Sequence, residues 1–136
     1  MEQRIGLRCG ASPPEERREL HYDGDAAETE RITMEREANA ALTAKNFARA
    51  RWLYAELLER YPQQICYGVC WLDALTEGWN PKRRLTKQQR TMAERLVKRL
   101  LRQASAGTRP MAAASATKWN LLTALWDRQE SKNQKE

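Results

Sequence analysis

Apolar residues recur every three or four positions through one segment of the chain after another, and this period constrains the fold more than any other feature. The clearest stripe consists of Phe47, Ala50, Tyr54, Leu57 and Leu58. No segment alternates apolar and polar residues for any length, as a half-buried strand would. The sequence therefore predicts an all-α protein, a small bundle of five or six helices.

Residues that start or stop helices separate these stripes. Asn46 can cap one helix, and Thr86 with Gln89 has the pattern of a capping box for another. Pro62 ends the helix before it, and Gly78 suits a left-handed stop. The predicted helices cover about 25–44, capped by Asp25, then 47–61, 64–77, 86–104 and, starting at Met111 or Ser115, a last segment that ends near 128.

The length of 136 residues suits one domain. We expect an N-terminal extension over 1–24 that can hold a short helix, one helical domain over 25–128, and a disordered polar tail over 129–136. No stretch approaches the roughly 18 consecutive apolar residues of a membrane-spanning helix, and no apolar run of signal-peptide length begins the chain. These features predict a cytoplasmic protein that does not enter a membrane.

The charges divide unevenly along the chain. Residues 1–80 hold 10 Lys or Arg and 14 Asp or Glu, a balance of −4, whereas residues 81–136 hold 14 and 4, a balance of +10. Such asymmetry hints at a polyanionic partner, although a solvated helix face would carry the same charges. We call the densest part the basic ridge; it comprises Lys82, Arg83, Arg84, Lys87, Arg90, Arg95, Lys98, Arg99 and Arg102.

Most of the basic ridge is expected to lie opposite an apolar stripe that runs from Met92 to Leu101, with Arg90 and Arg99 at its edges. Trp79, in the loop before the ridge, is expected to be exposed and to contact the same partner, because Trp and Arg are frequent binding hot spots. A second aromatic face, expected in the core, consists of Trp119, Leu122 and Trp126.

Residues 34–62 resemble a single tetratricopeptide repeat, in which two antiparallel helices cross at small residues and an aromatic side chain fills the groove between them. Glu37, Ala41 and Leu57 depart from the repeat pattern, and no second clean repeat follows. The resemblance implies a repeat-like hairpin inside a bundle, because isolated repeats cannot bury their own faces. The matching positions are Ala38, Phe47, Ala50, Tyr54 and Pro62.

Residues 44–58 are also similar to the PerC-type bacterial transcriptional activators, which carry a Gly-x-aromatic-Arg-Arg-Ala run followed by Trp-Leu. Lys45 stands in place of the Gly, Ala48 in place of one Arg, and Tyr54 in place of the Trp. This similarity implies a small helical regulator of transcription.

Residues that carry chemistry are sparse. Cys66 and Cys70 lie one helical turn apart, and with Cys9 and His21 they could make a four-ligand zinc site. Their spacing matches no zinc motif, so free, buried thiols are the plainer interpretation. No Gly-rich phosphate loop, Ser-His-Asp arrangement or convincing pair of carboxylates is present. The sequence therefore predicts no enzyme activity, no metal and no cofactor.

The leading hypothesis is a regulatory protein whose basic C-terminal half contacts nucleic acid or a nucleic-acid machine, with the hairpin as scaffold or homodimer surface. Phosphate contacts from the basic ridge would supply salt-dependent affinity. The alternative is a protein–protein adaptor or inhibitor, chaperone-like or encoded by a mobile element, that docks on an acidic protein. The basic ridge and Trp79 would make the contact in either case.

Overall fold

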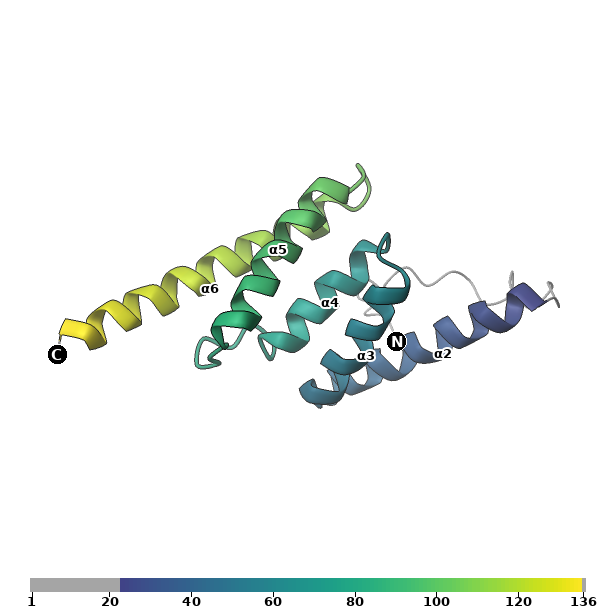
Figure 1. The fold of residues 1–136 in the computed structure, drawn as a ribbon, viewed down its shortest axis with the longest axis horizontal. Helices are drawn as coiled ribbons and strands as arrows, with labels where there is room; N and C mark the ends of the chain where they lie inside the picture. The colour runs from purple at the N-terminus through teal and green to yellow at the C-terminus, as the bar shows by residue number, and fades with distance from the viewer. Residues whose placement is uncertain (1–22, 136) are drawn as a thin grey trace.

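Five helices form the part of the chain that the computed structural model describes, namely the backbone of residues 23–135 and the side chains of residues 26–132 (Figure 1). They are α2 (Asp23–Thr43), α3 (Phe47–Arg60), α4 (Ile65–Leu75), α5 (Lys87–Gln103) and α6 (Arg109–Lys135). No strand occurs between residues 23 and 135, so the predicted all-α fold is confirmed there. None of the five helices combines the length and the apolarity that a membrane span requires.

The short helix α4 lies in the middle of the molecule, with α2 and α3 on one side and α5 and α6 on the other (Figure 1). All of its side chains except Val69 and Asp73 are buried. A helix that is apolar around its whole circumference is stable only where other elements cover every side. The packing of α3, α5 and α6 on α4 meets this requirement, while α2 and α6 extend away from the centre in opposite directions.

The turn between α2 and α3 follows the predicted capping. Lys45 adopts a positive φ of 65°, and the Asn46 side chain accepts a hydrogen bond from the backbone N–H of Arg49. Ala38 and Ala50 are fully buried where the two helices pack against each other, and small side chains allow close approach there. This part of the chain is a helical hairpin, as the sequence predicts.

A buried ionic cluster joins α2 to α4. Arg31 donates from Nη1 to the Tyr67 hydroxyl at 2.7 Å and to Glu35 Oε1 at 3.2 Å, and the Tyr67 hydroxyl donates to Glu35 Oε1 at 2.8 Å. Arg31 also pairs with Glu28, and the hydrogen bond to Glu28 raises the pKa of the guanidinium. Burial, together with the hydrogen bond to Glu35, raises the pKa of Tyr67. These groups remain hydrogen-bonded inside the fold, which offsets the cost of removing their charges from water.

The loop after α4 turns through three successive residues with positive φ, Glu77 at 52°, Gly78 at 75° and Trp79 at 60°. Gly78 is left-handed as predicted, but α4 ends at Leu75, two residues earlier than expected, and Glu77 is the first left-handed residue after it. The Thr76 hydroxyl stabilises the turn, because it accepts from the Trp79 backbone N–H at 3.0 Å. The Trp79 indole N–H donates to Asp73, and burial raises the pKa of that carboxyl against the opposing effect of this hydrogen bond.

The capping box that begins α5 is confirmed, since the Thr86 side chain accepts from Gln89 N and the Gln89 side chain accepts from Thr86 N, both at 3.0 Å. The orientation of α5 differs from the expected one. Met92 and Leu101 are 49% and 43% exposed, and the buried face consists of Ala93, Leu96, Val97 and Leu100. Helix periodicity fixes which residues share a face, but the neighbouring helices determine which part of a wide apolar face they cover.

The close approach of α5 to α4 depends on Gly68. A Cβ atom at this position would lie 2.8 Å from Leu100 Cδ2, which is closer than real Cβ contacts. The absence of a side chain at Gly68 therefore lets Leu100 pack directly on the α4 backbone.

The last helix confirms the predicted aromatic core and corrects its predicted ends. Trp119, Leu122 and Trp126 are buried, and the two indoles pack edge to face with 6.0 Å between ring centroids. However, α6 begins at Arg109 and continues to Lys135, so residues 129–135 are helical where a disordered tail was expected. The backbone of α2 begins at Asp23, which places Asp25 inside the helix rather than at its cap. The expected extension lies outside the described residues up to residue 22.

Candidate binding site

The structure divides the basic ridge into two groups, and the first, residues 82–90, is partly used inside the fold. Arg83 donates from Nε to the Leu75 carbonyl at 3.1 Å and pairs with Glu77 at 3.6 Å. Arg84 donates from Nη2 to Gln129 Oε1 at 2.7 Å. These contacts join the loop before α5 to the end of α4 and to α6.

Arg90 has a similar internal role. Its Nη2 lies 2.9 Å from Asp127 Oδ1, and its guanidinium carbon lies 5.8 Å from the centroid of the Trp126 ring. Both contacts join α5 to α6. In this first group only Lys82 and Lys87 have exposed side chains that form no hydrogen bond or ion pair with another described residue.

Trp79 is half-buried and packs against the core, whereas the sequence predicts an exposed side chain. Its indole N–H is already engaged by Asp73. The loop conformation explains the difference, because the positive φ of Trp79 turns the side chain back onto α4. Trp79 therefore supports the shape of the loop and presents little free surface.

The second group of the ridge forms a stripe on α5 at positions i, i+3, i+4 and i+7. No hydrogen bond or ion pair joins any of its four side chains to another residue in the described part of the chain. Like charges at i, i+4 repel each other by a few tenths of a kcal/mol per pair, so the stripe is a source of unrelieved repulsion in the isolated protein. We call this set the cationic stripe; it comprises Arg95, Lys98, Arg99 and Arg102.

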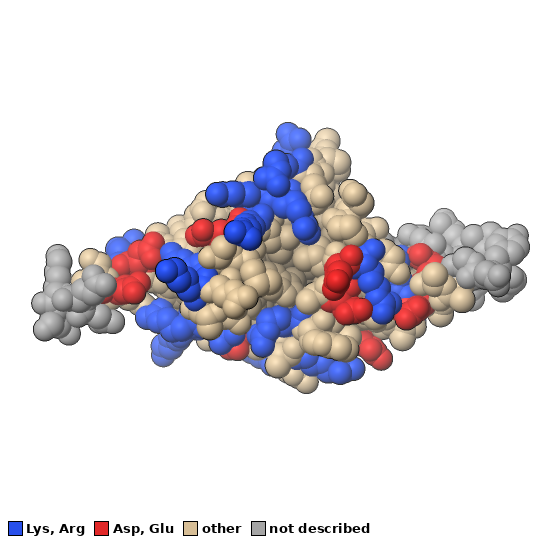
Figure 2. All heavy atoms as spheres, in the orientation of Figure 1, with Lys and Arg blue, Asp and Glu red and all other residues tan. Residues whose placement is uncertain are grey.

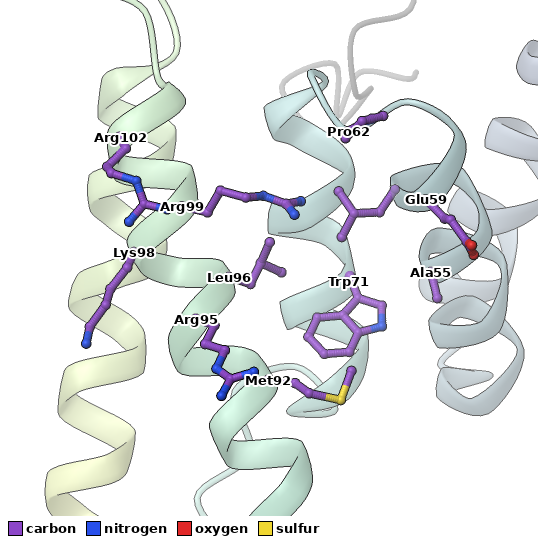
Figure 3. A pocket seen from close by; sticks show the side chains of 11 residues that line it. Ala55, Glu59, Pro62, Trp71, Met92, Arg95, Leu96, Lys98, Arg99 and Arg102 are labelled. Carbon is purple, nitrogen blue, oxygen red and sulfur yellow. The ribbon is translucent and has the colours of Figure 1, made fainter.

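The cationic stripe forms one wall of a pocket of about 700 Å³ between α3 and α5. Both helices pack on α4, and Trp71 of α4 lies between them in the lining (Figure 3). Met92 lies beside Trp71 at one end of the pocket, and Arg99 and Pro62 lie at the other end. The rest of the lining is largely apolar and consists of Ala55, Leu58, Glu59 and Leu96.

Arg99 is the most unusual residue of the pocket. Its side chain extends from α5 across the pocket toward α3 (Figure 3), and its Nε and Nη2 atoms are buried without any hydrogen-bond partner in the described part of the chain. The carboxylate of Glu59, the only acid in the lining, points away from it. A buried donor without a partner is costly, and a guanidinium presents a planar fork of N–H groups that matches a carboxylate or a phosphate. Arg99 is therefore the residue of the cationic stripe with buried, unsatisfied donors in the described part of the chain.

Two exposed apolar side chains lie in the pocket lining or beside it. Met92 is 49% exposed and lies in the lining, and Trp52 on α3 is 64% exposed. Trp52 precedes Ala55 by three residues and Glu59 by seven, so it lies on the same face of α3 as these two lining residues. We call the pocket, together with the exposed apolar surface of Trp52 beside it, the groove.

The two sides of the groove differ in charge. Figure 2 shows Lys and Arg side chains gathered over α5 on one side of a hollow, and acidic and basic side chains next to each other over α3 on the opposite side. On α3, Glu56 pairs with Arg60 at 3.1 Å, and Glu59 is exposed at the pocket edge. The site therefore combines one cationic wall, an apolar lining and one wall of mixed charge.

Cys66 and Cys70 are buried. Within the described residues no group of three or more His, Cys, Asp or Glu side chains could hold a metal ion. Cys9 and His21, the other members of the considered zinc set, lie outside the described residues.

No protein-family model, curated protein or solved structure matches the chain in any of three comparisons. The resemblances to a tetratricopeptide repeat and to the PerC-type activators therefore gain no support from known proteins. What the fold and the site themselves define is a small all-helical protein with a groove beside a cationic helix face.

Sequence reasoning identified the four cations of the pocket but not the groove beside them. The sequence predicts Leu58 and Met92 as members of apolar stripes and does not indicate that Trp71, Pro62 and Ala55 line a pocket. One signal was available, since Trp52 falls outside the apolar stripe of its own helix and a large apolar residue there is expected to be exposed.

Proposed function

We propose that this chain is a non-enzymatic binding protein, an adaptor or inhibitor, that docks an acidic segment of another protein against α5. The observation that carries this proposal is the cationic stripe, four side chains without partners in the described chain that border an apolar pocket. Cations next to apolar surface recognise a ligand that offers both carboxylates and apolar side chains. A short segment of a protein chain can carry both carboxylates and apolar side chains.

The sequence alone ranks nucleic acid first, and the geometry favours a protein instead. A phosphate backbone is uniformly anionic, so it gains nothing from the apolar lining, and Glu59 at the pocket edge would repel it. Within the pocket lining the one aromatic residue, Trp71, is 7% exposed and offers a base little surface for stacking, whereas the exposed Trp52 lies on α3, across from the cationic stripe. Fewer residues of the basic ridge can contact phosphates than the sequence suggests, because Arg83, Arg84 and Arg90 already contact other parts of the fold.

Nucleic acid remains the second candidate on one specific observation. Lys82 and Lys87 are exposed near the start of α5, away from the pocket, and belong to the half of the chain with a balance of +10. Phosphate contacts through these lysines would not require the pocket at all. The two candidates therefore depend on different residues of the same ridge.

A pull-down from lysate, with and without nuclease, tests the proposal. The variant Arg95→Glu/Arg102→Glu reverses two charges at the pocket, and Lys82→Glu/Lys87→Glu makes the same change of charge outside it. We expect a protein that survives nuclease, is lost with the first variant and is retained by the second. Material that disappears with nuclease, or that depends on the two lysines, would support the nucleic-acid candidate and contradict the proposal.

A further inference from the structure

We propose that the groove between α3 and α5 is the docking site for a single amphipathic helix of the partner, anchored by a carboxylate on Arg99. This inference rests on the proposed function and specifies the shape and the pattern of the bound segment. Three observations carry it: the dimensions of the groove, the buried guanidinium and the difference in charge between the two walls.

The groove lies where one more helix could pack against α3, α4 and α5. α3 and α5 both pack on α4, and the space between them is lined by side chains from all three helices. In Figure 3, Ala55 and Met92 mark one end and Pro62 and Arg102 the other, so the lining of α3 and that of α5 run in the same direction. From Met92 to Arg102 the groove is about 15 Å long, which is close to three helical turns. A helix laid in it would contact α3, α4 and α5 together.

Charge complementarity identifies the chemistry of that helix. Four cations line the α5 wall, and Glu59 is the only charge that α3 contributes to the lining. An occupant therefore needs acidic residues along one edge only, next to an apolar strip that faces Trp71, Leu58 and Met92. An amphipathic helix provides such neighbouring strips, whereas an extended peptide alternates its side chains between two opposite faces.

The spacing of the cationic stripe predicts the sequence pattern of the partner. Arg95, Lys98, Arg99 and Arg102 are related by i, i+3, i+4 and i+7, so acids that pair with them recur at helical spacing too. The apolar strip lies about a quarter turn away, which places an apolar residue directly beside each acid in the sequence. One acid would pair with the guanidinium of Arg99, whose side chain extends into the pocket.

A selection from displayed random peptides of about 16 residues, long enough for about four helical turns, tests this inference on the full-length chain. Parallel selections would use the wild type and Arg99→Met. We expect peptides enriched on the wild type alone, with acids at i, i+4 and i+7 and an apolar neighbour beside each. A synthetic peptide of this kind should bind about tenfold more weakly, or worse, to Arg99→Met, as expected when a hot-spot residue is removed.

Two further variants keep the result interpretable. Met92→Glu changes an exposed lining residue, so it should weaken the peptide without unfolding the protein. Lys87→Met removes one charge from the same helix outside the pocket and should leave binding within about twofold. The inference is supported if the acids of the selected peptides recur at helical spacing and if peptide binding is weakened by both Arg99→Met and Met92→Glu.

Other outcomes would overturn it in distinguishable ways. Acids enriched without helical spacing would reject the helix, and equal binding to Arg99→Met would reject the groove, while the adaptor proposal could survive either result through its own pull-down. Selected peptides without acids would also reject the groove. Displacement of the peptide by a random-sequence oligonucleotide, itself sensitive to Arg99→Met, would reject both the inference and the proposed function.

Discussion

Replacing Arg99 by Met should make the protein more stable, which is the reverse of what most substitutions of half-buried residues do. The Nε and Nη2 atoms of Arg99 are buried without hydrogen-bond partners in the described residues, and an unsatisfied buried polar group costs about 1–3 kcal/mol, more when charged. The substitution also removes a like-charge pair with Arg95 at i, i+4, worth about 0.2–0.5 kcal/mol. Met has a similar helix propensity and can fill the same apolar lining.

We therefore expect Arg99→Met to raise the free energy of unfolding by about 1–3 kcal/mol, an increase that arises from the loss of the unpaired donors. Urea denaturation followed by far-ultraviolet circular dichroism would measure it, with Lys87→Met as a control that should change the value by no more than about 0.5 kcal/mol. A decrease of 1 kcal/mol or more, on the order of one lost hydrogen bond, would mean that the guanidinium stabilises the free protein. The argument that Arg99 is reserved for a ligand would then fail.

Three further changes test the fold around the site. Tyr67→Phe should lower the free energy of unfolding by about 1–3 kcal/mol in urea denaturation, because Glu35 loses a buried donor; an unchanged value would mean that the buried cluster is not formed. Gly68→Ala should destabilise by up to about 2 kcal/mol, the cost of overpacking against the buried Leu100 less the roughly 1 kcal/mol that Ala gains over Gly in a helix, and adding Leu100→Ala should make the effect smaller; full additivity would contradict the packing. Burial raises the pKa of Asp73 above its ordinary value of 3.8, so the folded protein holds this proton more tightly than the unfolded chain. The stability of Asp73→Asn relative to wild type should therefore increase as the pH rises from 3.8 through the raised pKa, and a flat difference in a pH series of thermal melts would refute the shift.

The sequence was sufficient for local features of the fold because their causes are local. Asn46 and the Thr86 capping box act on backbone groups within three residues, and Gly78 provides a conformation that its own lack of a side chain permits. The central position of α4 was also predictable, since Ile65–Leu75 has no polar face.

The groove was not predictable in the same way, because it depends on where separate helices meet. The partners of Arg84 and Arg90 lie 45 and 37 residues away, so no local pattern indicates which basic side chains are engaged inside the fold. The sequence places Met92 in the apolar stripe of α5, but it does not show which residues of that stripe the other helices cover. In the fold Met92 stays exposed and lines the pocket between α3 and α5. The end of α6 was missed for another reason: composition predicted disorder over 129–136, whereas the helix continues through these polar residues to Lys135.

Hydrogen–deuterium exchange of the full chain, alone and bound to the protein captured in the pull-down, tests the central claim most directly. The account predicts slower exchange of backbone amides in Ala55–Pro62 and Met92–Arg102, the segments of α3 and α5 that border the groove. Segments outside the groove, such as Lys82–Lys87 and the end of α6, should keep their rates. Protection confined to Lys82–Lys87 or to α6, with the groove unchanged, would contradict the account.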